Sequence, residues 1–258
     1  MNIIDRLEDR VAGLLHGGAP RNPAREHTWL MVVRESDMLF VSWRMAVPIV
    51  RAAVPAALDI DTFDGHAWVT VEALHMDIVR FRSLPAPPKP IAGVEVNVRT
   101  YVRRGDVRGV YFLSLDAPGV IGNALNRLLF NLPFHTADVR LQLTGDNYHV
   151  ESTRPNHGPQ PVTFAASARI TGGPRAVAPG SIDEFLLTQT TLFGVDGHGR
   201  LFRGDVAHRP RVIHPVEGLV ETNTLTAAAG LPIPAAEPLM HYSPGDDSLA
   251  WPFERLDA

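Results

Sequence analysis

Hydrophobic and polar residues alternate without interruption along residues 94–103. One side of this stretch carries only valine and threonine: Val94, Val96, Val98, Thr100 and Val102. The other side carries an acid, an amide, two guanidinium groups and a phenol: Glu95, Asn97, Arg99, Tyr101 and Arg103. A period of two, with β-branched residues on the apolar side, predicts a β-strand. The turn-forming sequence Arg104-Gly105-Asp106 and a second apolar stretch over 107–116 extend this strand into a hairpin.

The rest of the chain repeats this pattern of strands and turns. Two further hairpins are predicted where apolar stretches flank glycine-containing turns, at 137–143 with 148–153 and at 192–195 with 200–206. Other strands are expected at 67–81 and at 162–170. Residues 29–33 and 38–44 are expected to form either two strands or one bent strand. Short helices are expected at 1–22, at 48–55, from Asp116 to 131, and from the capping-box pattern at Ser181 through Leu187.

This order of elements favours an α+β fold that is predominantly antiparallel β, with a few peripheral helices packed outside the sheet. No repeat, low-complexity linker or shift in composition marks a domain boundary. We therefore expect a single domain over residues 1–258, in which residues 1–22 form an N-terminal helical arm and residues 23–258 form the β core.

The composition excludes several classes of function. The net charge of −4 gives no reason to expect nucleic acid or an anionic membrane surface as a partner. No apolar run approaches the ~20 residues that span a bilayer, and the start of the chain lacks the layout of a secretion signal, so a cytoplasmic protein is expected. Cysteine is absent, which removes disulfides, thiolate catalysis and cysteine metal sites.

Few sequence motifs for catalysis are present. The histidines are scattered without the spacing of metal ligands, and neither a Gly-x-Ser-x-Gly elbow nor a glycine-rich phosphate loop occurs. The only lysine, Lys89, lies in the proline-rich sequence Pro87-Pro88-Lys89-Pro90, which is typical of an exposed loop and a poor place for imine chemistry. We expect neither a metal nor a cofactor.

The polar side of residues 94–103 has two interpretations. If it faces the inside of a curved or closed sheet, Arg99 and Asn97 can bind a carboxylate or polarise a carbonyl, and Glu95 or Tyr101 can move a proton. Glu95 and Arg99 are about 13 Å apart along a strand, so they would share a ligand rather than pair. In the alternative, the row is a structural ladder or a wet outer face, with Arg99 bonded to an acid of a neighbouring strand.

A set of short sequences along most of the chain resembles the YqjF-like family of uncharacterised bacterial proteins. They occur in this order: Leu58–Gly65, Glu95–Val102, Gly109–Asp116, Leu132-Pro133-Phe134, Tyr148 with Arg154, Val206–Pro210 and His241-Tyr242-Ser243. That family is similar in turn to acetoacetate decarboxylase, and residues 54–61 resemble a Val-Pro-x-x-Leu-x-Ile-Asp sequence of the decarboxylase itself. The resemblance implies a β-cone, a strongly curved antiparallel sheet around an apolar pocket.

The resemblance does not extend to the decarboxylase activity. The decarboxylase forms an imine through a lysine in a Tyr-Pro-Lys-Lys sequence, and the sequence here that looks equivalent is Tyr101-Val102-Arg103-Arg104. An arginine stays protonated near neutral pH and cannot form the imine. The family also often has Glu-Arg-Tyr where this chain has Gln189-Thr190-Thr191, so no role is assigned to that segment.

Two hypotheses follow. In the first, the protein is a β-cone that binds a small carboxylate or carbonyl compound, as a binding protein or as an enzyme without Schiff-base chemistry. Its predicted site residues are Glu95 and Tyr101 for proton transfer, Arg99 as anion anchor, Asn97 as orienting donor, and Tyr111 and His75 as neighbours. In the second, it is a non-catalytic interaction protein with a filled pocket. Homo-oligomerisation is left open by the sequence.

Overall fold

The computed structural model describes residues 29–82, 91–119, 131–155 and 160–256. Three expected features lie outside these residues. They are the N-terminal helical arm at 1–22, the proline-rich loop with Lys89, and most of the helix expected after Asp116.

The described residues form mainly β-strands. The strands that build the ring and its extension are β1 (Met31–Met45), β3 (Ala67–Phe81), β4 (Ile91–Arg104), β5 (Val107–Ala117), β7 (Asp138–Thr144), β8 (Asn147–Arg154), β9 (Val162–Ile170), β11 (Thr191–Val195), β12 (Leu201–His208), β13 (Val212–Asn223) and β14 (Leu239–Ala250). Shorter elements are β2 (Asp59–Ile60), β6 (Phe134–Thr136), β10 (Arg175–Ala176), β15 (Glu254–Arg255) and the helices α2 (Val47–Arg51), α4 (Ile182–Leu187) and α5 (Leu225–Ala228).

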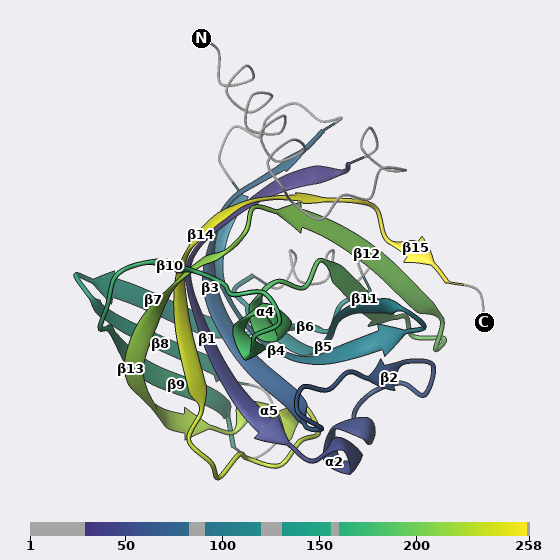
Figure 1. The fold of residues 1–258 in the computed structure, drawn as a ribbon, viewed down its shortest axis with the longest axis horizontal. Coiled ribbons are helices and arrows are strands. Elements are labelled where there is room, and N and C mark those ends of the chain that lie inside the picture. Colours follow the sequence, from purple (N-terminus) through teal and green to yellow (C-terminus); the bar gives the residue numbers. More distant parts are fainter. Residues whose placement is uncertain (1–28, 83–90, 120–130, 156–159, 257–258) are drawn as a thin grey trace.

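Seven strands close into a ring, visible in Figure 1. Their order is β12-β11-β5-β4-β3-β1-β14, and β12 pairs again with β14 through Val206 opposite Ala250. Neighbours are antiparallel except β5 with β11. Because the ring closes, these strands leave no open edge around its circumference. The α+β, predominantly antiparallel fold and its curved cone are therefore confirmed.

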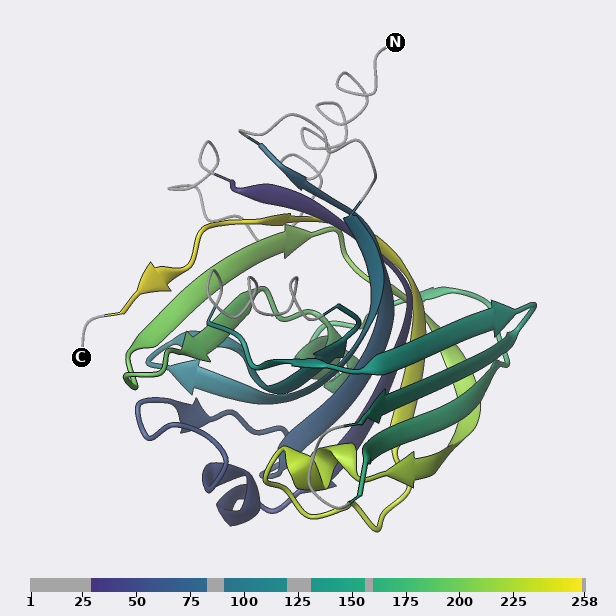
Figure 2. The ribbon, with the colours of Figure 1, turned by 180° about the vertical axis from the view of Figure 1, so that it is seen from behind.

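A second layer extends from the ring through β13, β9, β8 and β7 and lies beside β1 and β3 (Figure 2). Val96, Val98 and Val102 of β4 are fully buried in the same apolar cluster as Val150 and Phe164 of this layer. The valine side of the predicted strand therefore packs outward from the ring, against the second layer. Its polar side faces the inside, so both faces of β4 are buried.

One helix differs from the expected arrangement. Residues 182–187 form α4 as the capping-box pattern predicts, and the backbone N–H of Glu184 donates to Ser181 Oγ at 3.2 Å. We expected the helices outside the sheet, but α4 lies within the outline of the ring in both views. Its consecutive residues Phe185, Leu186 and Leu187 are all buried, in one apolar cluster with Met38, Phe40 and Tyr101 of the sheet.

Two further regions differ from the sequence prediction. No defined element was predicted after residue 206, where the structure has the long strands β13 and β14. Asp116 was expected to cap a helix, but it lies near the end of β5 and is fully buried. Its carboxylate accepts hydrogen bonds from Arg154 and Ser152 of β8, so it joins the ring to the second layer.

Candidate functional site

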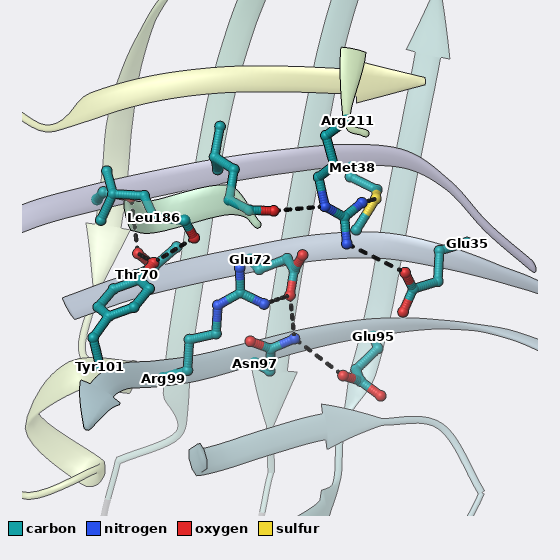
Figure 3. A network of polar contacts seen from close by, with 12 residues as sticks. Glu35, Met38, Thr70, Glu72, Glu95, Asn97, Arg99, Tyr101, Leu186 and Arg211 are labelled. Carbon is teal, nitrogen blue, oxygen red and sulfur yellow. Dashed lines mark hydrogen bonds and ion pairs between the residues drawn. The ribbon is translucent and has the colours of Figure 1, made fainter. Parts of the chain in front are cut away.

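The polar row of β4 lies inside the cone and is buried. Glu95 is 7% exposed, Asn97 1%, Arg99 9% and Tyr101 0%. Figure 3 shows these four side chains along one face of the strand, together with polar residues from β1 and β3. The interpretation as a wet outer face therefore fails, and the four residues belong to one buried network.

A glutamate of the neighbouring strand holds the middle of this network. The register of β3 and β4 places Glu72 opposite Asn97. Glu72 Oε2 accepts hydrogen bonds from Arg99 Nη1 at 2.6 Å and from Asn97 Nδ2 at 3.0 Å. Asn97 Nδ2 also donates to Glu95 Oε1 at 3.1 Å. Arg99 is thus bonded to an acid of a neighbouring strand, as the structural alternative predicted.

At one end of the row, Tyr101 connects the sheet to α4 through a hydrogen bond. The Tyr101 hydroxyl donates to the carbonyl oxygen of Leu186 at 2.9 Å and lies 2.7 Å from Thr70 Oγ1. The ring of Phe185 packs against the Tyr101 ring, with centroids 4.8 Å apart. Burial raises the pKa of Tyr101. With its hydroxyl fully engaged, Tyr101 closes this end of the network.

At the other end, the network is open to water and contains a second guanidinium, that of Arg211. Its Nε donates to the carbonyl oxygen of Leu187 at 2.7 Å, its Nη1 lies 3.0 Å from Met38 Sδ, and its Nη2 lies 3.7 Å from Glu35 Oε2. The Glu35 side chain is 24% exposed and that of Arg211 10%. Water therefore reaches the network from the Glu35 end.

The backbone at this end is shaped by a glycine. Gly245 of β14 lies opposite Ser36 with φ at +90°, and a Cβ atom there would overlap the carbonyl oxygen of Glu35. Only glycine combines this backbone angle with so close an approach. The sequence of β14 thereby fixes the position of β1 at Glu35.

Burial dominates the electrostatics of the acids. It raises the pKa of Glu95 to about 8, with a further contribution from the nearby charges of Glu72 and Glu35, against the opposing hydrogen bond from Asn97. Burial also raises the pKa of Glu35, which Arg211 opposes. At neutral pH Glu95 is therefore mainly a neutral carboxylic acid, able to donate a proton or a hydrogen bond.

Three buried atoms of the network have no hydrogen-bond partner among the residues that the structure describes: Glu72 Oε1, Asn97 Oδ1 and Arg99 Nε. They are two acceptors and one donor within a single cluster. Buried polar atoms in proteins are almost always paired, and exceptions concentrate where function needs them. The side-chain Nδ2 of Asn97 already donates to Glu72 and Glu95. The atom of Asn97 that remains for a ligand is therefore the acceptor Oδ1.

Two predicted neighbours lie elsewhere. His75 is on the face of β3 opposite to Glu72, and its Nδ1 lies 3.3 Å from Asp37 Oδ2. Tyr111 pairs with Thr100, on the face of β5 that turns away from Arg99, and lines an open hollow of about 330 Å³. Strand alternation separates both from the row, so the expectation that they adjoin it is wrong.

The histidines of the described segments do not assemble a metal site. No group of three or more histidines and acids there could hold a metal ion. His208 lies buried at the end of β12, where its Nδ1 bonds to the Arg209 carbonyl oxygen at 2.7 Å, and burial together with the charge of Arg211 lowers its pKa to about 4. His214 bonds instead to the Gly172 carbonyl oxygen.

Sequence reasoning missed three members of the network: Glu35, Glu72 and Arg211. A signal existed for Glu72, which is the only charged residue in the stretch 67–76 of β3. The strand was predicted from its apolar side, with Val69, Val71 and Ala73, and Glu72 lies on the opposite side. Glu35 and Arg211 lie in polar segments where charged residues are ordinary, so only the folded structure identifies them.

Comparison with known sequences identifies the family. Residues 33–247 match the model of the DUF2071 family, described as an uncharacterized conserved protein. The chain belongs to this family. It is 33% identical over 227 residues to the uncharacterized protein YqjF of Bacillus subtilis (strain 168). The aligned residues make up 88% of this chain and 93% of YqjF. Within the parts of the DUF2071 chain that the structure covers, no helix is both long and apolar enough to cross a bilayer.

Solved structures with the same fold are acetoacetate decarboxylase-like. An acetoacetate decarboxylase-like enzyme from Sphingomonas wittichii RW1 has a TM-score of 0.61 at 16% identity, over 89% of this chain and 94% of that one. Acetoacetate decarboxylase from Legionella pneumophila has 0.61 at 14%, over 93% and 92%. The enduracididine biosynthesis enzyme MppR, complexed with pyruvate, has 0.62 at 12%, over 92% and 96%. At these identities the likeness establishes the fold alone.

Proposed function

We propose that the inside of the cone binds a small organic acid or carbonyl compound, and that Glu95 acts on this ligand as a neutral acid. The proposal rests on the burial, the pKa and the hydrogen bonding of Glu95. It is a buried carboxyl group with a pKa raised to about 8, hydrogen-bonded to Asn97 in a cluster with three unpaired polar atoms. Strongly shifted acids beside unpaired groups are characteristic of binding and catalytic sites.

The chemistry available to this site is acid–base and electrostatic. Glu95 can donate to a carbonyl oxygen, Arg99 Nε can donate to an oxygen of the ligand, and Asn97 Oδ1 can accept from a hydroxyl group. An imine route is not part of the proposal, because none of the residues that the structure describes is a lysine. Arg103 and Arg104, at the turn end of β4, lie outside the network. The pyruvate complex of MppR, a protein with the same fold, supports a small keto acid as the first compound to test.

A non-catalytic role remains the second candidate, because α4 fills part of the cone. Phe185, Leu186 and Leu187 are buried against the inner face, and Tyr101 is fully engaged with them. In that case the unpaired atoms would be structural, and no small acid would bind.

Thermal unfolding with a panel of small keto acids, hydroxy acids and their neutral amides separates these two candidates. A ligand at about 100 times its dissociation constant stabilises the folded state by ~2.7 kcal/mol, which corresponds to a rise in Tm of several degrees for a chain of this length. We expect at least one acid or carbonyl compound to produce such a rise, and Glu95→Gln and Arg99→Ala to reduce it. If no compound raises the Tm, or if Arg99→Ala leaves every rise unchanged, the proposed roles are wrong.

A further inference from the structure

We infer that Arg211, and not Arg99, binds the charged end of the ligand, and that this end is a single carboxylate entering beside Glu35. The inference rests on the proposed function and adds to it the anion-binding residue, the direction of entry and the charge of the ligand. No sequence motif singles out Arg211, which lies directly before β13.

The two guanidinium groups of the cone differ in their partners. Arg99 is bonded to the Glu72 carboxylate at 2.6 Å and shares that acceptor with Asn97. Arg211 bonds to a backbone carbonyl and a thioether, which carry no charge, and its nearest carboxyl oxygen is 3.7 Å away, beyond a normal hydrogen bond. Arg99 is thus in direct contact with its carboxylate at 2.6 Å, whereas Arg211 faces Glu35 only at 3.7 Å and has room for a closer carboxylate.

The exposure of the side chains gives the direction of entry. Glu35 has the most exposed side chain of the network, at 24%, whereas the side chains of Arg211 and Arg99 are both 10% exposed and that of Glu72 is 3% exposed. Figure 3 shows Arg211 beside Glu35 and Arg99 on the far side of Glu72, so a ligand that enters at Glu35 meets Arg211 before it meets the Glu72–Arg99 pair. The Tyr101 end of the row is closed by α4, so the neutral part of the ligand stays at the opposite end, beside Glu95 and Asn97.

An aromatic ring fixes both guanidinium groups in place. The guanidinium carbon Cζ of Arg99 lies 5.4 Å from the centre of the Phe40 ring, and that of Arg211 lies 5.7 Å from it. Cation–π contact of this kind is strongest when the cation is desolvated. Phe40 therefore keeps the planar donors of Arg211 oriented before any ligand arrives, which lowers the entropy lost on binding.

The charge of the network limits the charge of the ligand. The ionisable groups of the network around Arg211 come from four strands: Glu35 of β1, Glu72 of β3, Glu95 and Arg99 of β4, and His208 of β12. With Glu95 and His208 neutral, two carboxylates and two guanidinium groups balance. A monocarboxylate restores neutrality if Glu35 takes up one proton, and burial already favours the protonated form of Glu35. A dianion would require two such changes, so a single carboxylate is preferred.

The test compares a small keto acid with its neutral amide by isothermal titration calorimetry, using pyruvate and pyruvamide as the first pair. In the wild type we expect the acid to bind at least 10 times more tightly than the amide. In Arg211→Gln the acid should lose about 10- to 100-fold in affinity, which is the range for charge-assisted hydrogen bonds, while the amide is unaffected. Arg211→Lys keeps the charge and should retain part of the preference.

A matched control lies two residues away. Arg209 is 48% exposed and lies 3.7 Å from Asp246 at the surface, so Arg209→Gln should leave both affinities unchanged. Equal binding of acid and amide to the wild type, or an unchanged acid affinity in Arg211→Gln, overturns the inference but leaves the proposed function standing. Failure of both compounds and of the wider panel to bind the wild type overturns the proposed function itself. If Arg211→Gln does not fold, the acid-to-amide ratios of the wild type and of Arg211→Lys decide the question.

Discussion

Replacing Glu72 with glutamine is expected to lower the free energy of unfolding by ~3–5 kcal/mol. Glu72 is 2% exposed, and its carboxylate is the acceptor for both Arg99 and Asn97. Glutamine keeps the shape of the side chain but removes its charge, so the buried guanidinium of Arg99 loses its counter-ion. Urea denaturation at pH 7, with the midpoint and slope fitted together, measures the loss.

Two variants show whether the loss comes from the uncompensated charge. Glu151→Gln changes an acid whose side chain is 51% exposed, and it should alter stability by less than ~0.5 kcal/mol. The double variant Glu72→Leu/Arg99→Met removes both charges and should recover most of the stability, because apolar residues of similar volume can replace a buried ion pair. A loss below ~1 kcal/mol in Glu72→Gln would show that another group balances Arg99.

Replacing Glu95 with glutamine is expected to remove a pH dependence of stability. The pKa of Glu95 is about 8 in the folded protein, against an ordinary value of 4.5. Between these values the folded state keeps a proton that the unfolded state releases, so stability falls as the pH rises. The stability contributed by the neutral form is complete below pH 4.5 and is lost as the pH rises to about 8.

The difference in unfolding free energy between wild type and Glu95→Gln isolates this contribution. It should fall by up to ~1.4 kcal/mol per pH unit within that window and level off above it. Acids that do not interact with Glu95 affect both proteins equally and cancel in the difference. Glu217→Gln, at a side chain that is 75% exposed, is the matched control. A difference for Glu95→Gln that does not vary with pH would mean that Glu95 titrates normally.

The strands of the cone could be predicted from local pattern because their side chains alternate between two unlike environments. Residues 94–103 show this best, since their valines face the second layer while Glu95, Asn97, Arg99 and Tyr101 face the interior. The hairpins were predictable for a similar reason, because each turn contains a glycine at the reversal, as at Gly105 and Gly145, where φ is positive. The start and end of α4 followed from Ser181, Glu184 and the run of apolar residues.

The partners of the polar row could not be predicted, because they come from distant parts of the chain. Glu72 is 27 positions from Arg99, and Leu186 is 85 positions from Tyr101. A period of two shows that two residues share a face, but it does not show which strand lies next to them or at what register. The positions of β13 and β14 were missed for a further reason: prolines at 215 and 244 interrupt the pattern, although both strands tolerate them.

The protonation state of Glu95 at neutral pH is the quantity on which the proposed site depends most directly. Carbon-13 NMR of the glutamate carboxyl groups, with the Glu95 signal assigned by its absence in Glu95→Gln, follows this group through a pH titration. A midpoint near 8 is expected, with the neutral acid predominant at pH 7. A midpoint within about one unit of the ordinary glutamate value of 4.5 would show that Glu95 is a carboxylate at neutral pH, and would contradict its role as the acid of the cone.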